Sequence, residues 1–178
     1  MAATAEMPYF IRPSQNLAIA AKRTAYAEAR AACRATLAGE TDELVKMVTL
    51  NCLLKTHLPY FYWVGFYLVS ADDPQLLKVG PYQGTLGCLS IRFGRGVCGA
   101  VAATGTPKIL ADTHAVVQGS EHIACDPNSR SEIVLPVTRP DGTLLGVFDV
   151  DSTELGSFDE VDRTELEALL AETFSLRA

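Results

Sequence analysis

The residues of this chain best suited to chemistry are cysteines that lie among glycines and turns. Cys98 is the fifth residue of the stretch GRGVCG (94–99), Cys88 lies ten positions upstream, and Cys125 follows in a polar segment. Thiols in such segments are more often reactive than thiols inside helices, where cysteine usually acts as a small apolar residue. The glycine spacing also fits the turn that binds the pyrophosphate of a dinucleotide. The stretch therefore indicates either a thiol site or a nucleotide site.

The surroundings of the glycines disfavour the nucleotide site. A dinucleotide fingerprint needs a strand, the glycine turn, a full-length helix and an acid about 20 residues further on. Here the helical pattern ends near Gly105 and Pro107, and the next acid, Asp112, comes too early. We therefore expect the glycines to allow a tight turn. The helix that follows presents free N–H groups near Cys98, which favours a thiolate.

A second group of candidate residues is acidic. Glu132 precedes the apolar run IVLPV and faces either solvent or a cavity beneath the preceding polar loop. Asp149 and Asp151 are two apart in a predicted strand, so they point to the same face. Two carboxylates crowded on one face are costly unless a cation or a proton lies between them. This pair predicts a functional site.

Metal binding and serine hydrolysis are the alternatives that the residue types raise. Three histidines, His57, His114 and His122, and several cysteines supply ligand types, but neither C-x-x-C nor H-x-x-x-H occurs. His122 and Cys125 are three residues apart in a loop, which is a weak signal. A serine hydrolase lacks its G-x-S-x-G motif here. We expect no metal site and no cofactor.

Composition excludes several classes of protein. The net charge of −6 over 178 residues disfavours nucleic acid as a partner. The longest aromatic-rich apolar run, 58–69, has 12 residues and is too short to span a membrane. The five cysteines are odd in number and no secretory signal is visible, so we expect a cytoplasmic protein without a disulfide framework. Cys33 and Cys52 lie in helical patterns and are predicted to be buried.

The elements that must position these residues predict an α+β fold with an antiparallel sheet and helices on one side. Ser14 is the expected N-cap of the first helix, and Pro59 ends the second. The segment 113–130 has no clear period and is predicted to be a long loop of the kind that often binds ligands. The expected helices are 14–40, 42–58, 98–105 and 157–178. The expected strands are 60–70, 75–84, 88–93 and 107–112, followed by the two arms of a hairpin over 131–152 with its turn at 139–142.

Several motifs together resemble the free methionine-R-sulfoxide reductases, which are stand-alone GAF-domain enzymes. The resemblance rests on the motifs YWVGFYL, GPYQG, HIACD, SEIVLPV and GVFDVDS. It also rests on the cysteine that lies ten residues before the cysteine of GRGVCG. The resemblance runs over nearly the whole chain and implies a single GAF domain over 14–178, with 1–13 as an N-terminal extension. The segment between Cys98 and Cys125 is a few residues longer than the usual spacing of the family, which leaves the conformation of this loop open.

The resemblance assigns roles to the thiols. Cys125 matches the nucleophile that attacks the sulfoxide sulfur and becomes a sulfenic acid. Cys88 matches the resolving cysteine, and Cys98 matches a third cysteine that is an alternative resolver, so the main resolver stays open. A thioredoxin-type protein is the implied reductant, and a homodimer is the implied assembly.

The resemblance also assigns the substrate pocket. Glu132 matches the acid that protonates the departing oxygen, with Asp149 nearby and Asp151 at the substrate ammonium. Trp63 and Tyr67 match an aromatic wall against the methyl–sulfur end. The implied activity is reduction of free L-methionine-(R)-S-oxide. A GAF module that senses a small ligand and a peroxide-responsive thiol switch are the alternatives.

Overall fold

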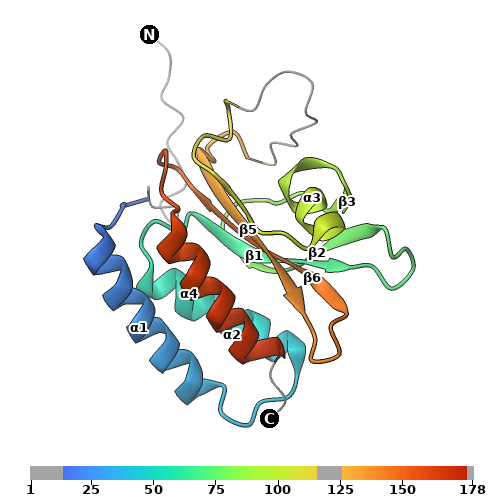
Figure 1. Ribbon diagram of the computed structural model, residues 1–178, viewed down its shortest axis with the longest axis horizontal. Helices are drawn as coiled ribbons and strands as arrows, with labels where there is room; N and C mark the ends of the chain where they lie inside the picture. The colour runs from blue at the N-terminus through green and yellow to red at the C-terminus, as the bar shows by residue number, and fades with distance from the viewer. Residues whose placement is uncertain (1–13, 116–125, 176–178) are drawn as a thin grey trace.

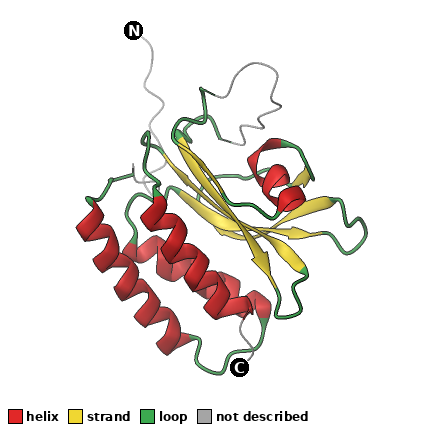
Figure 2. Ribbon diagram, viewed as in Figure 1, coloured by secondary structure: helices red, strands yellow, loops and turns green. Residues whose placement is uncertain are grey.

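The computed structural model describes residues 14–115 and 126–175, which form a six-stranded sheet with helices on both faces (Figures 1 and 2). The strand order is β3-β2-β1-β6-β5-β4, and every neighbouring pair is antiparallel. The strands are β1 (Trp63–Val69), β2 (Leu76–Gln83), β3 (Ser90–Arg92), β4 (Lys108–Leu110), β5 (Ser131–Thr138) and β6 (Leu144–Ser152). The helices are α1 (Ile19–Thr36), α2 (Glu43–His57), α3 (Gly96–Thr104) and α4 (Glu160–Leu170), and α4 continues into a π-helical turn, η1 (Ala171–Ser175). The α+β prediction is confirmed.

The expectation that all helices lie on one side is wrong for α3. Helices α1, α2 and α4 cover one face of the sheet, and α3 lies on the opposite face (Figure 1). Phe66 and Phe148 point into the large core under the three helices, whereas Tyr67 and Val147 point into a smaller core under α3. Alternation along β1 and β6 divides the sheet in this way, because successive side chains leave opposite faces.

The predicted start of the first helix is also wrong. Ser14 does not cap α1, which begins at Ile19. The Ser14 hydroxyl instead donates to the Tyr60 carbonyl oxygen at 3.0 Å, and its backbone N–H donates to the Thr153 hydroxyl at 2.9 Å. Ser14 therefore joins the chain before α1 to the segments beside β1 and β6, a long-range contact that helical propensity does not reveal.

A buried polar cluster joins α1 to α4 on the helical face of the sheet. The Lys22 ammonium donates to Asp162, and the other oxygen of that carboxylate accepts from the hydroxyls of Tyr26 and Tyr60. Asp162 is fully buried and Lys22 is 3% exposed, and the Lys22 ammonium also pairs with Asp159 at 2.9 Å, so the buried charges are compensated within the cluster. Among the described residues, no helix combines the length and apolar character that crossing a bilayer requires.

Candidate functional site

A pocket lies on the face of the sheet covered by α3, where the smaller core opens to solvent. Its empty volume, which includes the open solvent at the mouth, is about 560 Å³. The lining brings together strands β1, β5 and β6, the start of α3 and the loop before β3. Its polar and aromatic lining residues include Trp63, Tyr67, Arg95, Cys98, Asp126, Ser129, Glu132, Asp149 and Asp151. All of the predicted site residues in the described ranges except Cys88 line this pocket.

The glycines of 94–99 shape the turn that enters α3. Gly94 and Gly96 have φ of +78° and +62°, a left-handed conformation that glycine adopts without strain. A Cβ on Gly99 would come within 2.2 Å of the Arg92 carbonyl oxygen, so the two backbones pack directly together. The helix has nine residues and the sheet is antiparallel, so the prediction of a tight turn rather than a dinucleotide cradle is confirmed.

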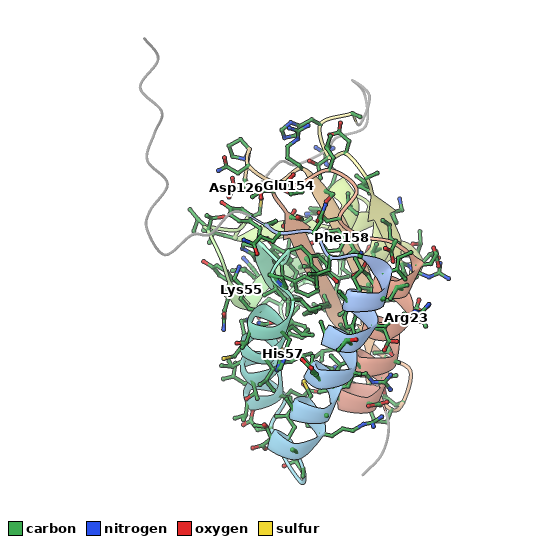
Figure 3. The ribbon with its side chains drawn as sticks, turned by 90° about the vertical axis from the view of Figure 1, so that its left-hand side faces the viewer. Arg23, Lys55, His57, Asp126, Glu154 and Phe158 are labelled. Atoms are coloured by element: carbon green, nitrogen blue, oxygen red, sulfur yellow. The ribbon has the colours of Figure 1, made fainter. Side chains whose placement is uncertain are left out.

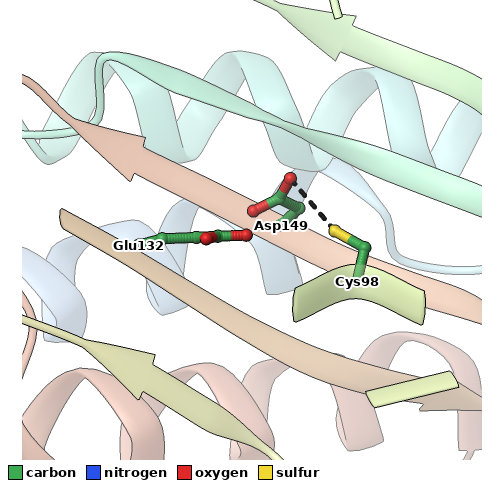
Figure 4. Close-up of side chains that lie close together, drawn as sticks. All are labelled: Cys98, Glu132 and Asp149. Carbon is green, nitrogen blue, oxygen red and sulfur yellow. Dashed lines mark hydrogen bonds between the residues drawn. The ribbon is translucent and has the colours of Figure 1, made fainter. Parts of the chain in front are cut away.

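This turn buries the Cys98 thiol against the acids. The Cys98 Sγ–H donates to Asp149 Oδ2 at 3.3 Å, and Glu132 lies beside them (Figure 4). Burial raises the pKa of Cys98 well above its usual range, and the nearby carboxyl groups of Asp149 and Glu132 raise it further. The expectation that the N-terminus of α3 favours a thiolate is therefore wrong, because desolvation and neighbouring acids outweigh the helix dipole.

Glu132 and Asp149 are held in conditions that favour their protonated forms. They are 7% and 6% exposed, and burial is the main cause that raises the pKa of each carboxyl group. The charges of Asp149 and Asp151 raise the pKa of Glu132 further, and the charge of Asp151 raises the pKa of Asp149 further. A buried acid that keeps its proton near neutral pH can donate it to a bound oxygen.

Asp151 differs from these two acids because it is only half-buried. The Ser129 hydroxyl donates to Asp151 Oδ1. Burial raises the pKa of Asp151 to about 7, although the Ser129 hydrogen bond opposes this by favouring the carboxylate. Asp149 and Asp151 both line the pocket, as their spacing predicts. Asp151 can therefore carry a charge near neutral pH while its neighbours stay neutral.

Aromatic side chains of β1 line the pocket beside the acids of β6. The Trp63 ring stacks on Tyr67 and on Tyr82, with ring centroids 5.6 and 5.2 Å apart. Its indole N–H donates to the Thr85 carbonyl oxygen at 3.0 Å, which fixes the orientation of the ring. A Cβ on Gly65 would come within 2.8 Å of the Trp63 ring, so this glycine leaves room for the indole. A flat, apolar surface in the same pocket as proton donors suits a small ligand with one apolar and one polar end.

Cys88 lies at the edge of this wall. It is half-buried and takes part in a disulfide, and its backbone hydrogen-bonds the Tyr67 hydroxyl. The other described cysteines, Cys33, Cys52 and Cys98, are free. Cys33 is buried as predicted, whereas Cys52 is exposed on α2, so that prediction is wrong. Cys125, together with His122, lies outside the described residues.

Asp126 is a site residue whose contacts the sequence did not reveal. Its residue type is typical of a turn, and its Oδ1 does accept the hydrogen bond from the Asn128 backbone N–H at 2.8 Å that such a turn forms. Its other oxygen accepts from the Tyr62 hydroxyl at 2.9 Å and from the Thr85 hydroxyl. Burial pushes the pKa of Asp126 upward, but the hydrogen bonds, with those from Thr85 and Asn128 foremost, hold it below its usual range. Figure 3 shows Asp126 at the end of the molecule beyond the helices.

Comparison with known proteins places this architecture in a family. The model of the GAF domain matches residues 49–173. Free methionine-R-sulfoxide reductase of Escherichia coli is 40% identical over 147 residues, which are 83% of this chain and 85% of that protein. The protein of the same name from Saccharomyces cerevisiae is 43% identical over 107 residues, 60% of this chain and 58% of that protein. This chain belongs to the GAF-domain family that contains these reductases.

Solved structures agree with this placement of the GAF domain. The free methionine-R-sulfoxide reductase of Neisseria meningitidis in complex with its substrate superimposes with a TM-score of 0.77 and 37% identity, over 90% of this chain and 91% of that one. A putative GAF sensor protein from Burkholderia vietnamiensis gives a TM-score of 0.79 and 38% identity, over 88% and 95%.

Proposed function

We propose that this GAF domain reduces free L-methionine-(R)-S-oxide to L-methionine by thiol chemistry. The observation that carries the proposal is the pocket itself, in which an aromatic wall lies beside buried acids and a disulfide-forming cysteine lies at the edge. The relatives named as free methionine-R-sulfoxide reductases support the same activity.

Each part of the pocket suits one part of this substrate. The methyl–sulfur end would lie against Trp63 and Tyr67, where its apolar surface leaves water. The sulfoxide oxygen would accept a hydrogen bond from Glu132 or Asp149, the two buried acids whose raised pKa values keep them protonated. The substrate ammonium would pair with Asp151. Methionine sulfoxide within a peptide lacks that ammonium, so we expect selectivity for the free amino acid.

The proposed reaction uses two thiols and releases one water. The Cys125 thiolate attacks the sulfoxide sulfur, Glu132 protonates the oxygen, and methionine leaves as the oxygen passes to Cys125 as a sulfenic acid. The Cys88 thiol then attacks that sulfur, a disulfide forms, and the oxygen departs as water. The balance is one sulfoxide and two thiols giving one thioether, one disulfide and one water.

The contacts around the cysteines favour Cys88 as the resolving thiol. Cys88 already takes part in a disulfide, whereas Cys98 is free and buried. Its raised pKa keeps Cys98 in the thiol form, which is a poor nucleophile. We infer that Cys98 acts by donating its hydrogen bond to Asp149 and that Cys88 pairs with Cys125.

Recycling of the enzyme then requires a dithiol reductant. Cys88 lies between Leu86 and Leu89, whose side chains are 73% and 70% exposed. Apolar residues beside a disulfide suit contact with a protein, so we infer a thioredoxin-type reductant acting in a reducing compartment such as the cytoplasm. The homodimer stays a prediction.

The test is turnover of racemic free methionine sulfoxide with dithiothreitol, followed by quantification of methionine. We expect methionine to stop at about half of the racemate, because one epimer alone fits the pocket. Asp149→Asn should remove most of this turnover, whereas Asp141→Asn in the exposed hairpin turn should leave it unchanged. Absence of methionine, with a bound small ligand or a reaction with peroxide instead, would refute the proposal.

A further inference from the structure

One thiol and two carboxyl groups converge in the pocket. The Cys98 sulfur, a Glu132 carboxyl oxygen and an Asp149 carboxyl oxygen all lie within 4.8 Å of one another (Figure 4). They come from α3, β5 and β6, so three separate elements fix their positions. All three residues are at least nine-tenths buried. Ligand atoms at this spacing can surround one small ion without a change of fold.

A second observation shows that this cluster is incomplete as it stands. Asp149 Oδ2 accepts from the Cys98 thiol, but its other oxygen, Oδ1, is buried and has no hydrogen-bond partner among the described residues. Buried carboxyl oxygens are nearly always paired with a donor or a cation. Among the described residues that line the pocket, four are acids and Arg95 is the one with a cationic side chain. An added positive charge would therefore relieve both the unpaired oxygen and the crowding of acids.

The donor set selects the kind of cation. Mg²⁺ and Ca²⁺ prefer six or more oxygen ligands, which a cluster containing a thiol does not offer. Zn²⁺ accepts thiolate sulfur at about 2.3 Å and carboxylate oxygen at about 2.0–2.2 Å, in a tetrahedral arrangement. With Cys98, Glu132 and Asp149 as three ligands, the fourth position would face the pocket and hold water.

We propose that Cys98, Glu132 and Asp149 form a binding site for a thiophilic divalent cation of the Zn²⁺ type, and that this cation excludes the sulfoxide substrate from the pocket. The cation would hold the two acids that the bound oxygen needs, so cation and substrate compete. The competition rests on the proposed function, whereas binding of the cation does not.

The first experiment measures Zn²⁺ binding to the disulfide form of the full chain. In this form Cys88 is bonded, so the resolving thiol cannot supply a ligand. Competition against a chromophoric chelator should give one Zn²⁺ per chain. Co²⁺ in its place should show a thiolate-to-metal charge-transfer band. Absence of bound metal would overturn the proposal, whether or not the enzyme is active.

Variants then locate the ion. Cys98→Ser should abolish the Co²⁺ charge-transfer band and weaken Zn²⁺ binding by more than the roughly 10- to 100-fold that loss of an outer-shell partner costs. Asp149→Asn should weaken it similarly, and it keeps the proposal testable if Cys98→Ser fails to fold. Cys52→Ser is the matched control, because Cys52 is free and exposed on α2. A Cys52→Ser variant that loses the ion would show binding at the surface thiol and overturn the proposal.

Competition is tested last, with free methionine (R)-sulfoxide added to the Zn²⁺-loaded disulfide form. We expect the apparent Kd for Zn²⁺ to rise in proportion to the sulfoxide concentration. Bound Zn²⁺ that is unaffected by saturating sulfoxide, in a protein that turns this substrate over, would overturn the exclusion while leaving the proposed function intact.

Discussion

Replacing Asp151 with asparagine should stabilise the fold at alkaline pH while impairing the enzyme. Burial raises the pKa of Asp151 to about 7, whereas an aspartate in an unfolded chain titrates near 3.9. Asparagine has nearly the same shape and can still accept a hydrogen bond from Ser129, but it carries no charge. The variant therefore removes the cost of ionising this residue, which burial and the nearby Asp126 carboxylate raise.

The sign of the effect follows from proton binding. Between about pH 4 and pH 7 the folded state holds a proton on Asp151 that the unfolded state has lost. The contribution of Asp151 to the free energy of unfolding is therefore fully present below about pH 4 and is lost as the pH rises through about 7. Between about pH 5 and the pKa of about 7, the free energy of unfolding falls by about 1.36 kcal/mol for each pH unit. Over these roughly two units, the loss is at most about 3 kcal/mol. Solvent screens this half-buried side chain, so we expect about 1–2 kcal/mol.

Urea unfolding near pH 5 and near pH 9 measures this difference. Asp151→Asn should gain about 1–2 kcal/mol relative to the parent protein between the two conditions. Asp141→Asn is the matched control, because hydrogen bonds from Thr143 hold the pKa of that exposed carboxyl group below its usual range, and it should show no such gain. An Asp151→Asn variant whose relative stability is the same at both pH values would show that ionisation of Asp151 does not destabilise the fold.

Three further predictions address the wall, the disulfide and the helical face. Trp63→Leu removes the aromatic stack and should raise the KM for methionine sulfoxide by roughly 3- to 10-fold, since such stacking contributes about 0.5–1.5 kcal/mol; an unchanged KM would contradict the aromatic wall. Leu89→Ser should raise the KM for a thioredoxin-type protein but leave dithiothreitol-driven turnover unchanged, and Leu155→Ser, which is also exposed, should change neither. Asp162→Asn should lower the free energy of unfolding by about 1.5–3 kcal/mol, because it removes the charged acceptor of two buried tyrosine hydroxyls and leaves the partly exposed Asp159 as the carboxylate partner of Lys22. The KM should not change, and a loss of stability below about 1 kcal/mol would contradict this prediction.

Local signals in the sequence predicted those parts of the site that depend on one strand or one turn. Asp149 and Asp151 share a face because strands alternate, and the glycines of 94–99 form a tight turn because two of them adopt positive φ. The hairpin of β5 and β6 followed from alternation on both sides of the turn at 139–142. These features need no knowledge of distant neighbours.

The parts that could not be predicted depend on contacts between distant segments. The face that α3 covers is set by packing against Val134 and Val147, and its short pattern carries no such information. The protonation of the Cys98 thiol depends on acids from β5 and β6. Its position at the helix N-terminus alone therefore predicted a shift of its pKa in the wrong direction. The side-chain contacts of Asp126 could not be predicted, because its partners Tyr62 and Thr85 lie 64 and 41 residues away in the sequence.

The most direct test of the proposed reaction is a single turnover by the fully reduced chain on excess racemic free methionine sulfoxide, without added reductant. We expect one methionine formed per chain, two thiols lost, and consumption of the R epimer alone. Cys88→Ser should still form one methionine but lose a single thiol, which is trapped as a sulfenic acid. Methionine formed by the Cys125→Ser variant, or no methionine from the parent chain, would rule out Cys125 as the nucleophile of this reaction.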